Sequence, residues 1–357
     1  MKGLHDMFTI TSTLLENGQT QLTVIADPSE VHEALSEGLG VLLTRMGLNV
    51  PEDMAPLDFV KGIAGEENAD DFVRSSVMNY MTPMVMTQAE VASVAAPDQD
   101  SEEVPQAGKP FTYTVTFFEK GSYTLDSYET IDLPLLVPGP VTEEEVDGQL
   151  SMLINALQAQ KGEDAPALTL ADIDDAWVEE NMKEMGIQSM EHLRSAMRAA
   201  AEHVQEDDVV LKEQKAAMAA WAERLIEKPQ QALIEAFAED MYYAVMMELS
   251  QKGFTMEKFL SQEGKTEEEF RAENMVRAEQ ALCESFMLDA IFDHEEMELT
   301  DEWIHRAAQA LVQEGDIDEA LETFKREGRY YMIEENAQRS MAADWVMGHT
   351  TFAFYEE

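Results

Sequence analysis

Residues 266–293 read TEEEFRAENMVRAEQALCESFMLDAIFD, and this stretch decides the fold class. Thr266 is followed three residues later by Glu269, the spacing of a capping box, which predicts that a helix begins here. An apolar run around Cys283 follows inside the same stretch. We expect one helix over about residues 267–293, with Cys283 as a small buried hydrophobe.

The same signals recur on both sides of this stretch. From residue 170 to 348 one helical pattern follows another, separated by Gly and Pro. A further helix is predicted after Thr142, which has capping-box spacing to Glu145. The other helices are expected over residues 189–227, 230–252, 255–262, 300–314, 316–328 and up to 347.

The first third of the chain has a different pattern. Apolar residues alternate on both sides of Asn17-Gly18, which predicts a β-hairpin over residues 8–26. Phe111, Tyr113, Val115 and Phe117 alternate with threonines and predict a further strand. Helices are expected from Pro28 to near Gly47, and over residues 57–64 and 68–86.

We therefore expect an α+β, mostly α protein of two domains. A small α+β domain would occupy residues 1–120, and a helical domain residues 121–357. Pro134, Pro138 and Pro140 interrupt an extended segment, so residues 121–141 are interpreted as a linker.

Charge limits the partners. The 357 residues contain 72 acidic and 24 basic residues, a formal net charge of −48. Such a surface repels nucleic acid and anionic membranes and favours cationic partners. The alternative is a proteome adapted to high salt. Repulsion between two negatively charged copies predicts a monomer or weak dimer. The sequence shows neither a leader-like N-terminus nor an apolar span of membrane length, which predicts a cytoplasmic protein.

The sequence contains no recognisable active-site pattern. There is no Gly-rich phosphate motif, no paired cysteine motif and no nucleophile elbow. Glu302 and His305 have the spacing of half a di-metal site, but the other half is missing, so chance explains the match. We expect no catalytic residue, no metal and no cofactor.

Apolar side chains are instead abundant on predicted helices, and 24 of the residues are methionines. Methionine is adaptable and recurs on surfaces that bind many partners. Helix-on-helix packing is the alternative for each of these residues. The candidate contacts for a bound polypeptide are Met246, Met247, Phe254, Phe259, Tyr330, Tyr331 and Met332.

Several segments in order resemble trigger factor, the bacterial chaperone that meets nascent chains. The resemblance implies a ribosome-binding-like N-terminal domain and an extended, two-armed, SurA-like chaperone domain. It also implies ATP-independent binding of unfolded or nascent polypeptides. The segments that carry it are residues 20–26, 56–60, 109–117, 141–150, 229–234 and 350–352.

Two departures from that family change the expected activity. The family carries a prolyl isomerase domain after the helix that corresponds to residues 142–160, whereas only about residues 161–168 are present here. A connection this short cannot hold a domain, so isomerase activity is expected to be absent.

The second departure is the ribosome-docking loop. The family has a Phe and an Arg where this chain has Leu48 and Asn49, and Glu52 and Asp53 add negative charge. Gly47 and Pro56 match the ends of the family's loop. Repulsion of phosphate predicts weak or no ribosome binding.

The resulting hypothesis is an ATP-independent chaperone that prefers basic clients. The alternative is a dedicated binding or assembly factor for one basic partner. An enzyme with an unrecognised carboxylate site is a third possibility.

Overall fold

The computed structural model describes residues 7–45, 48–51, 54–161, 168–312, 316–326 and 329–354. Its contacts divide the chain into two compact units. The first unit comprises Met1–Tyr128 and Ala222–Asp344, and the second comprises Glu129–Trp221 and Trp345–Glu357. The domain boundary expected at residue 120 stays a prediction.

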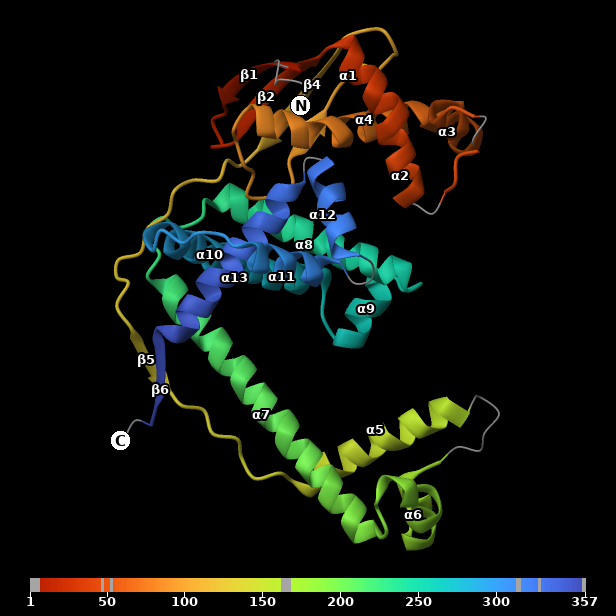
Figure 1. Cartoon of the computed structure of the whole chain (residues 1–357), viewed down its shortest axis with the longest axis vertical. Helices are drawn as coiled ribbons and strands as arrows, with labels where there is room; N and C mark the ends of the chain where they lie inside the picture. Colours follow the sequence, from red (N-terminus) through yellow and green to blue (C-terminus); the bar gives the residue numbers. More distant parts are fainter. Residues whose placement is uncertain are drawn as a thin grey trace. The chain divides into compact units, whose positions relative to one another are not determined.

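The first unit begins with a four-stranded antiparallel sheet in the order β1-β2-β4-β3. Figure 1 labels β1, β2 and β4 of this sheet. The hairpin predicted over residues 8–26 is present, and Gly18 in its turn has a φ of 84°, a conformation that glycine adopts at little cost. β4 is the strand expected from its alternating aromatics. The strands are β1 (Phe8–Leu14), β2 (Thr20–Ala26), β3 (Asp98–Asp100) and β4 (Phe111–Phe117).

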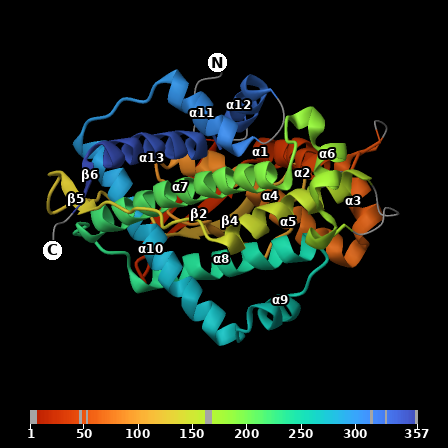
Figure 2. The same cartoon turned by 90° about the horizontal axis from the view of Figure 1, so that it is seen from below.

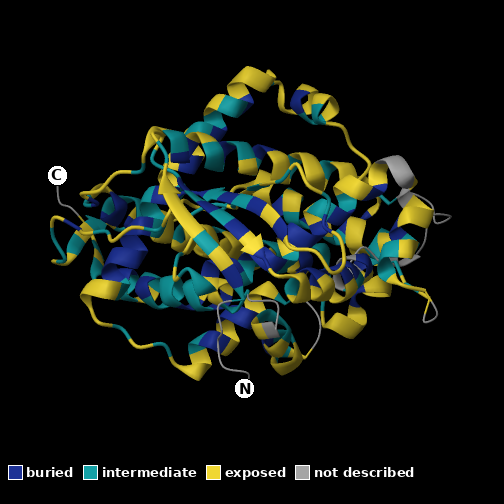
Figure 3. Ribbon diagram, turned by 90° about the horizontal axis from the view of Figure 1, so that it is seen from above, coloured by how far each residue is buried: buried dark blue, intermediate teal, exposed yellow. Residues whose placement is uncertain are grey.

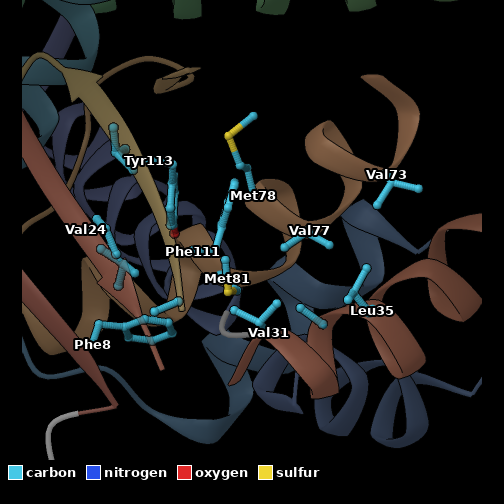
Figure 4. Packing of buried hydrophobic residues seen from close by; sticks show 14 of the residues in the cluster. Phe8, Val24, Val31, Leu35, Val73, Val77, Met78, Met81, Phe111 and Tyr113 are labelled. Carbon is cyan, nitrogen blue, oxygen red and sulfur yellow. The ribbon is translucent and has the colours of Figure 1, made fainter. Parts of the chain in front are cut away.

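One face of this sheet packs against helices. Along β4 buried residues alternate with more exposed ones, because successive side chains point to opposite faces (Figure 3). Phe8 and Phe111 from the sheet meet Met81 and Val77 of α4 in the core (Figure 4). The helices are α1 (Pro28–Glu33), a π-helical turn (Ala34–Gly38), α2 (Leu39–Arg45), α3 (Pro56–Ala64) and α4 (Glu66–Gln88).

The rest of the first unit is helical. The capping box predicted at the start of α10 is present, because Thr266 and Glu269 each bond the other's backbone N–H. α9 connects α8 to α10, as Figure 2 shows. The helices are α8 (Gln231–Gln251), α9 (Met256–Glu263), α10 (Glu267–His294), α11 (Asp301–Leu311), α12 (Ile317–Arg326) and most of α13 (Tyr330–Gly348).

The second unit has its own small core. Its helices are α5 (Glu143–Lys161), α6 (Asp175–Asn181) and most of α7 (Met190–Glu223), with 3₁₀ turns at Leu170–Asp172 and Lys183–Met185. Apolar residues of α5, α6 and α7 pack together, including Val146, Leu150, Val178 and Leu193. The predicted capping of α5 by Thr142 and Glu145 is present.

One part of the expected linker has a regular structure. β5 (Ile131–Pro134) pairs in parallel with β6 (Thr350–Ala353), which lies at the other end of the sequence. Pro134 is tolerated because both strands of this two-stranded sheet are edge strands. Trp221 anchors this pair, since its indole N–H donates to the Thr350 hydroxyl at 3.0 Å.

Candidate functional site

A cavity of about 1160 Å³ lies within the first unit. Its walls come from the second half of α4, from residues 90–97, from Gln99 of β3 and from α13 between Tyr331 and Ala343. Phe237 of α8, Leu288 of α10, Leu311 of α11 and Arg329, which precedes α13, complete the lining. The lining is largely apolar, as expected of a binding site.

Tyr331 and Met332 are predicted contact residues that line this cavity. The reason is helical geometry: Ile333 and Ala337 are completely buried against α11 and α12, so this stripe of α13 faces the core. Tyr331 and Met332 lie off that stripe and stay 46% and 38% exposed. An exposed aromatic and an exposed methionine side by side are available to a ligand.

Tyr330 does not belong to this surface. It is half-buried and packs against the cluster that α11, α12 and α13 form. Its ring also lies under the Lys325 ammonium, 5.2 Å from the ring centroid. For Tyr330 the structure therefore favours the packing role.

Charged groups lie at one side of the cavity, where Glu335 and Arg339 contribute to its lining. Arg339 holds the Asp289 carboxylate through two bonds, at 3.1 Å from Nε and 3.0 Å from Nη2. Lys120 reaches the same carboxylate at 3.0 Å and Glu335 at 3.2 Å. The Asp289 side chain is only 5% exposed, so its charge depends on these two cations.

The other predicted contacts lie around the connection between α8 and α10. Met247 is 56% exposed, Phe254 39% and Met246 36%, and Tyr243 beside them is 52% exposed. This second apolar surface comprises Tyr243, Met246, Met247 and Phe254, and we call it the α8–α9 patch. None of its residues lines the cavity.

Phe259 is half-buried and lies apart from the exposed contacts of that group. Its ring meets Phe270 edge to face, with centroids 5.7 Å apart, and it packs on the cluster of Tyr242, Leu260 and Phe270. Arg271 covers the Tyr242 ring at 3.8 Å from its centroid. The structure thus gives Phe259 a role in joining α9 to α10.

The docking-loop residues are only partly described. Leu48 packs against the N-terminal core and its N–H donates to the Leu43 carbonyl at 2.9 Å. Asn49 is exposed, and Pro56 begins α3. Gly47 lies outside the described residues, as do Glu52 and Asp53.

The described ranges contain no group of three or more His, Cys, Asp and Glu side chains placed to hold a metal ion. His305, from the half-motif with Glu302, instead lies 2.7 Å from the Asp301 carbonyl and 3.2 Å from the Asp318 carboxylate. The carbonyl and then the carboxylate raise the pKa of His305. None of the described helices is both long and apolar enough to cross a bilayer.

The geometry shows exposed apolar side chains on a helical scaffold, and comparison with known proteins gives the family to which the helical part is similar. Residues 188–348 match the family model of the bacterial trigger factor protein (TF) C-terminus. This part of the chain is therefore similar to the C-terminal domain of trigger factor.

Curated relatives agree with that match. The trigger factor of Desulforudis audaxviator is 25% identical over 226 residues, covering 59% of this chain and 50% of that protein. The trigger factor of Latilactobacillus sakei is 21% identical over 223 residues, covering 62% of this chain and 46% of that protein. The trigger factor of a Nocardioides species is 34% identical over 109 residues, covering 28% of this chain and 23% of that protein. The chain spans about half the length, or less, of the curated relatives it matches.

A solved structure of the trigger factor chaperone, reported for promiscuous substrate recognition in folding and assembly, was also found. It is 13% identical, with an alignment that covers 95% of this chain and 100% of that one at a TM-score of 0.37. The resemblance seen in the sequence is confirmed by the family match and by the named relatives, all of which are trigger factors.

Proposed function

We propose that this protein is an ATP-independent cytoplasmic chaperone that binds unfolded or nascent polypeptides in the cavity of the first unit. The observation that carries the proposal is the apolar cavity with Tyr331 and Met332 exposed in its lining. At about 1160 Å³ it exceeds the roughly 300–1,000 Å³ typical of small-molecule pockets, so several side chains of a polypeptide fit.

The α8–α9 patch supports the same proposal as a second contact. Four large apolar side chains on α8 and in the connection that follows it form an apolar surface of the kind that marks interaction sites. Two separate apolar surfaces suit a long, non-native chain better than a single folded ligand. Binding at two places also raises the overall affinity without strong binding at either.

We further propose that this chain lacks prolyl isomerase activity. α5 ends at Lys161 and the next element begins at Leu170, so eight residues separate them. A connection of this length has no room for a folded domain. An assay with a proline-containing peptide should therefore show the uncatalysed rate of isomerisation.

Ribosome binding is proposed to be weak or absent. The loop that precedes α3 carries Asn49 where the family has an arginine, together with two additional acids in its sequence. Those acids repel phosphate and remove the electrostatic attraction that docking on ribosomal RNA needs. Sedimentation with ribosomes at low salt tests this, and robust co-sedimentation would contradict it.

Net charge favours basic clients, and it also keeps a second candidate function in view. A net charge of −48 suits a dedicated factor that holds one cationic partner. The two functions differ in breadth: a general chaperone suppresses aggregation of several unrelated proteins, whereas a dedicated factor fails that test and binds one partner.

The test of the chaperone function is an aggregation assay with several unrelated unfolded proteins. The double variant Tyr331→Ser/Met332→Ser should suppress aggregation several-fold less well than the wild type, because it removes the exposed apolar lining. Met185→Ser is the matched control, since Met185 is 68% exposed but lies in the second unit, outside both surfaces. Equal activity of all three proteins would refute the assignment of the cavity.

A further inference from the structure

The sheet of the first unit has an open edge that extends beyond β3. Residues 92–94 run antiparallel to residues 118–120, and Ser93 forms an isolated bridge with Glu119. The N–H of Val94 donates to the Phe118 carbonyl, and the N–H of Lys120 donates to the Ala92 carbonyl, both at 2.9 Å. This segment, which precedes β3 in the chain, therefore continues the outer edge of the sheet beyond Asp98.

The hydrogen-bond pattern shows which way the backbone of Ser93 points. In an antiparallel ladder, a residue whose two neighbours make the cross-strand bonds directs its own N–H and C=O to the opposite side. Ala92 and Val94 make those bonds, so the Ser93 groups point away from residues 118–120. No other described residue bonds the backbone N–H or C=O of Ser93.

This open edge belongs to the cavity. Residues 91–97 and Gln99 all line it, together with Tyr331 and Met332 from α13. Alanines at 92, 95 and 96 leave little side-chain bulk beside the free backbone groups. An unpaired strand edge in an apolar cavity is a template for another strand.

We propose that an extended segment of a non-native polypeptide adds to this edge as a further strand, with its backbone bonded to Ser93. The inference rests on the proposed chaperone function and specifies how the same cavity recognises a client. Strand addition obtains affinity from backbone groups, which every polypeptide has, so it requires no particular sequence.

Charge specifies the occupant further. Glu90 precedes the edge and Asp98 and Asp100 follow it, and none of these three carboxylates forms an ion pair with another described residue. A strand laid along this edge brings its own side chains beside them. The preferred occupant is therefore an extended segment that carries lysine or arginine next to small or β-branched residues.

The probe is a synthetic peptide of about eight alternating valine and threonine residues with lysines at both ends. Ser93→Pro removes the outward N–H and places a ring on the edge, whereas the control Ser93→Ala removes only the hydroxyl. Because the Ser93 N–H has no partner among the described residues, neither change removes a backbone bond of the sheet. Thermal midpoints of both variants verify folding.

We expect Ser93→Pro to bind the peptide about tenfold more weakly than Ser93→Ala, which should match the wild type. A peptide with the same side chains but N-methylated amides should bind weakly to the wild type and to both Ser93 variants. Its affinity for Ser93→Pro should equal its affinity for Ser93→Ala. Equal binding of the unmethylated peptide by both Ser93 variants would overturn strand addition.

The outcome also separates this inference from the chaperone function. If the Tyr331→Ser/Met332→Ser variant loses peptide binding but neither proline nor N-methylation matters, the cavity binds clients through side chains alone and strand addition is wrong. If the wild type neither binds the peptide nor suppresses aggregation, both proposals fail.

Discussion

Replacing Asp289 with Ala is expected to loosen the first unit around α10. The Asp289 carboxylate is 5% exposed and forms ion pairs with both Arg339 and Lys120, whose side chains are 26% and 21% exposed. Without it, two cations remain close together in a mostly buried place with Glu335 as their shared anion. Removing one partner of a buried ion pair costs roughly 3–5 kcal/mol.

The lower end applies here because both cations keep some contact with water and retain Glu335. We expect a loss of about 3 kcal/mol in the free energy of unfolding of the first unit. At 1.4 kcal/mol per factor of ten, amide hydrogen exchange along α10 should accelerate by roughly a hundredfold, if exchange follows opening of the unit.

The double variant Asp289→Ala/Arg339→Met provides the control. This variant removes the Arg339 cation together with the Asp289 carboxylate that it pairs with. It should therefore be more stable than Asp289→Ala alone, by about 1–3 kcal/mol. Additive effects of the two substitutions would refute the reasoning, because they would show that the two side chains do not depend on each other.

Three further perturbations test other parts of the structure. A methyl group on Gly38 would lie 2.8 Å from Cγ of Tyr80, so Gly38→Ala should destabilise the N-terminal core by about 1 kcal/mol in urea unfolding despite the better helix propensity of alanine. Unchanged stability would show that Tyr80 moves freely. Trp221→Phe removes the hydrogen bond to Thr350 and part of a fully buried ring, and should cost about 2 kcal/mol, with the loss seen as faster exchange in β6. The raised pKa of His305 means that its protonated form is favoured in the folded state, so its contribution to stability is complete below the unfolded value near 6.5 and is lost as pH rises through the folded value. A folded-state pKa at or below 6.5 in an NMR titration would contradict this.

Local signals explain which elements could be predicted from the sequence. The strand at residues 111–117 and the helix that begins after Thr266 were predicted correctly, because alternation and capping are properties of neighbouring residues. The pairing of β5 with β6 was not predicted, since it joins residues more than 200 positions apart and one strand contains Pro134.

The candidate site divides in the same way. A dense apolar run predicted Tyr331 and Met332 as contact residues, and both line the cavity. The run could not show that Tyr330 packs against α11 and α12, because that depends on which stripe of α13 meets its neighbours. The edge at Ser93 was missed entirely. Its chemistry lies in the backbone, and small residues such as Ala92 give no side-chain signal.

The most direct test of the account is site-specific photo-crosslinking of an unfolded client. A photoreactive phenylalanine analogue placed at Tyr331 should capture unfolded clients of unrelated sequence, and capture should stop when the client has folded. The same analogue at Met185, which is more exposed than Tyr331 but lies outside both apolar surfaces, should capture little. Equal capture at the two positions, or capture at Met185 alone, would contradict the claim that this cavity holds non-native polypeptides.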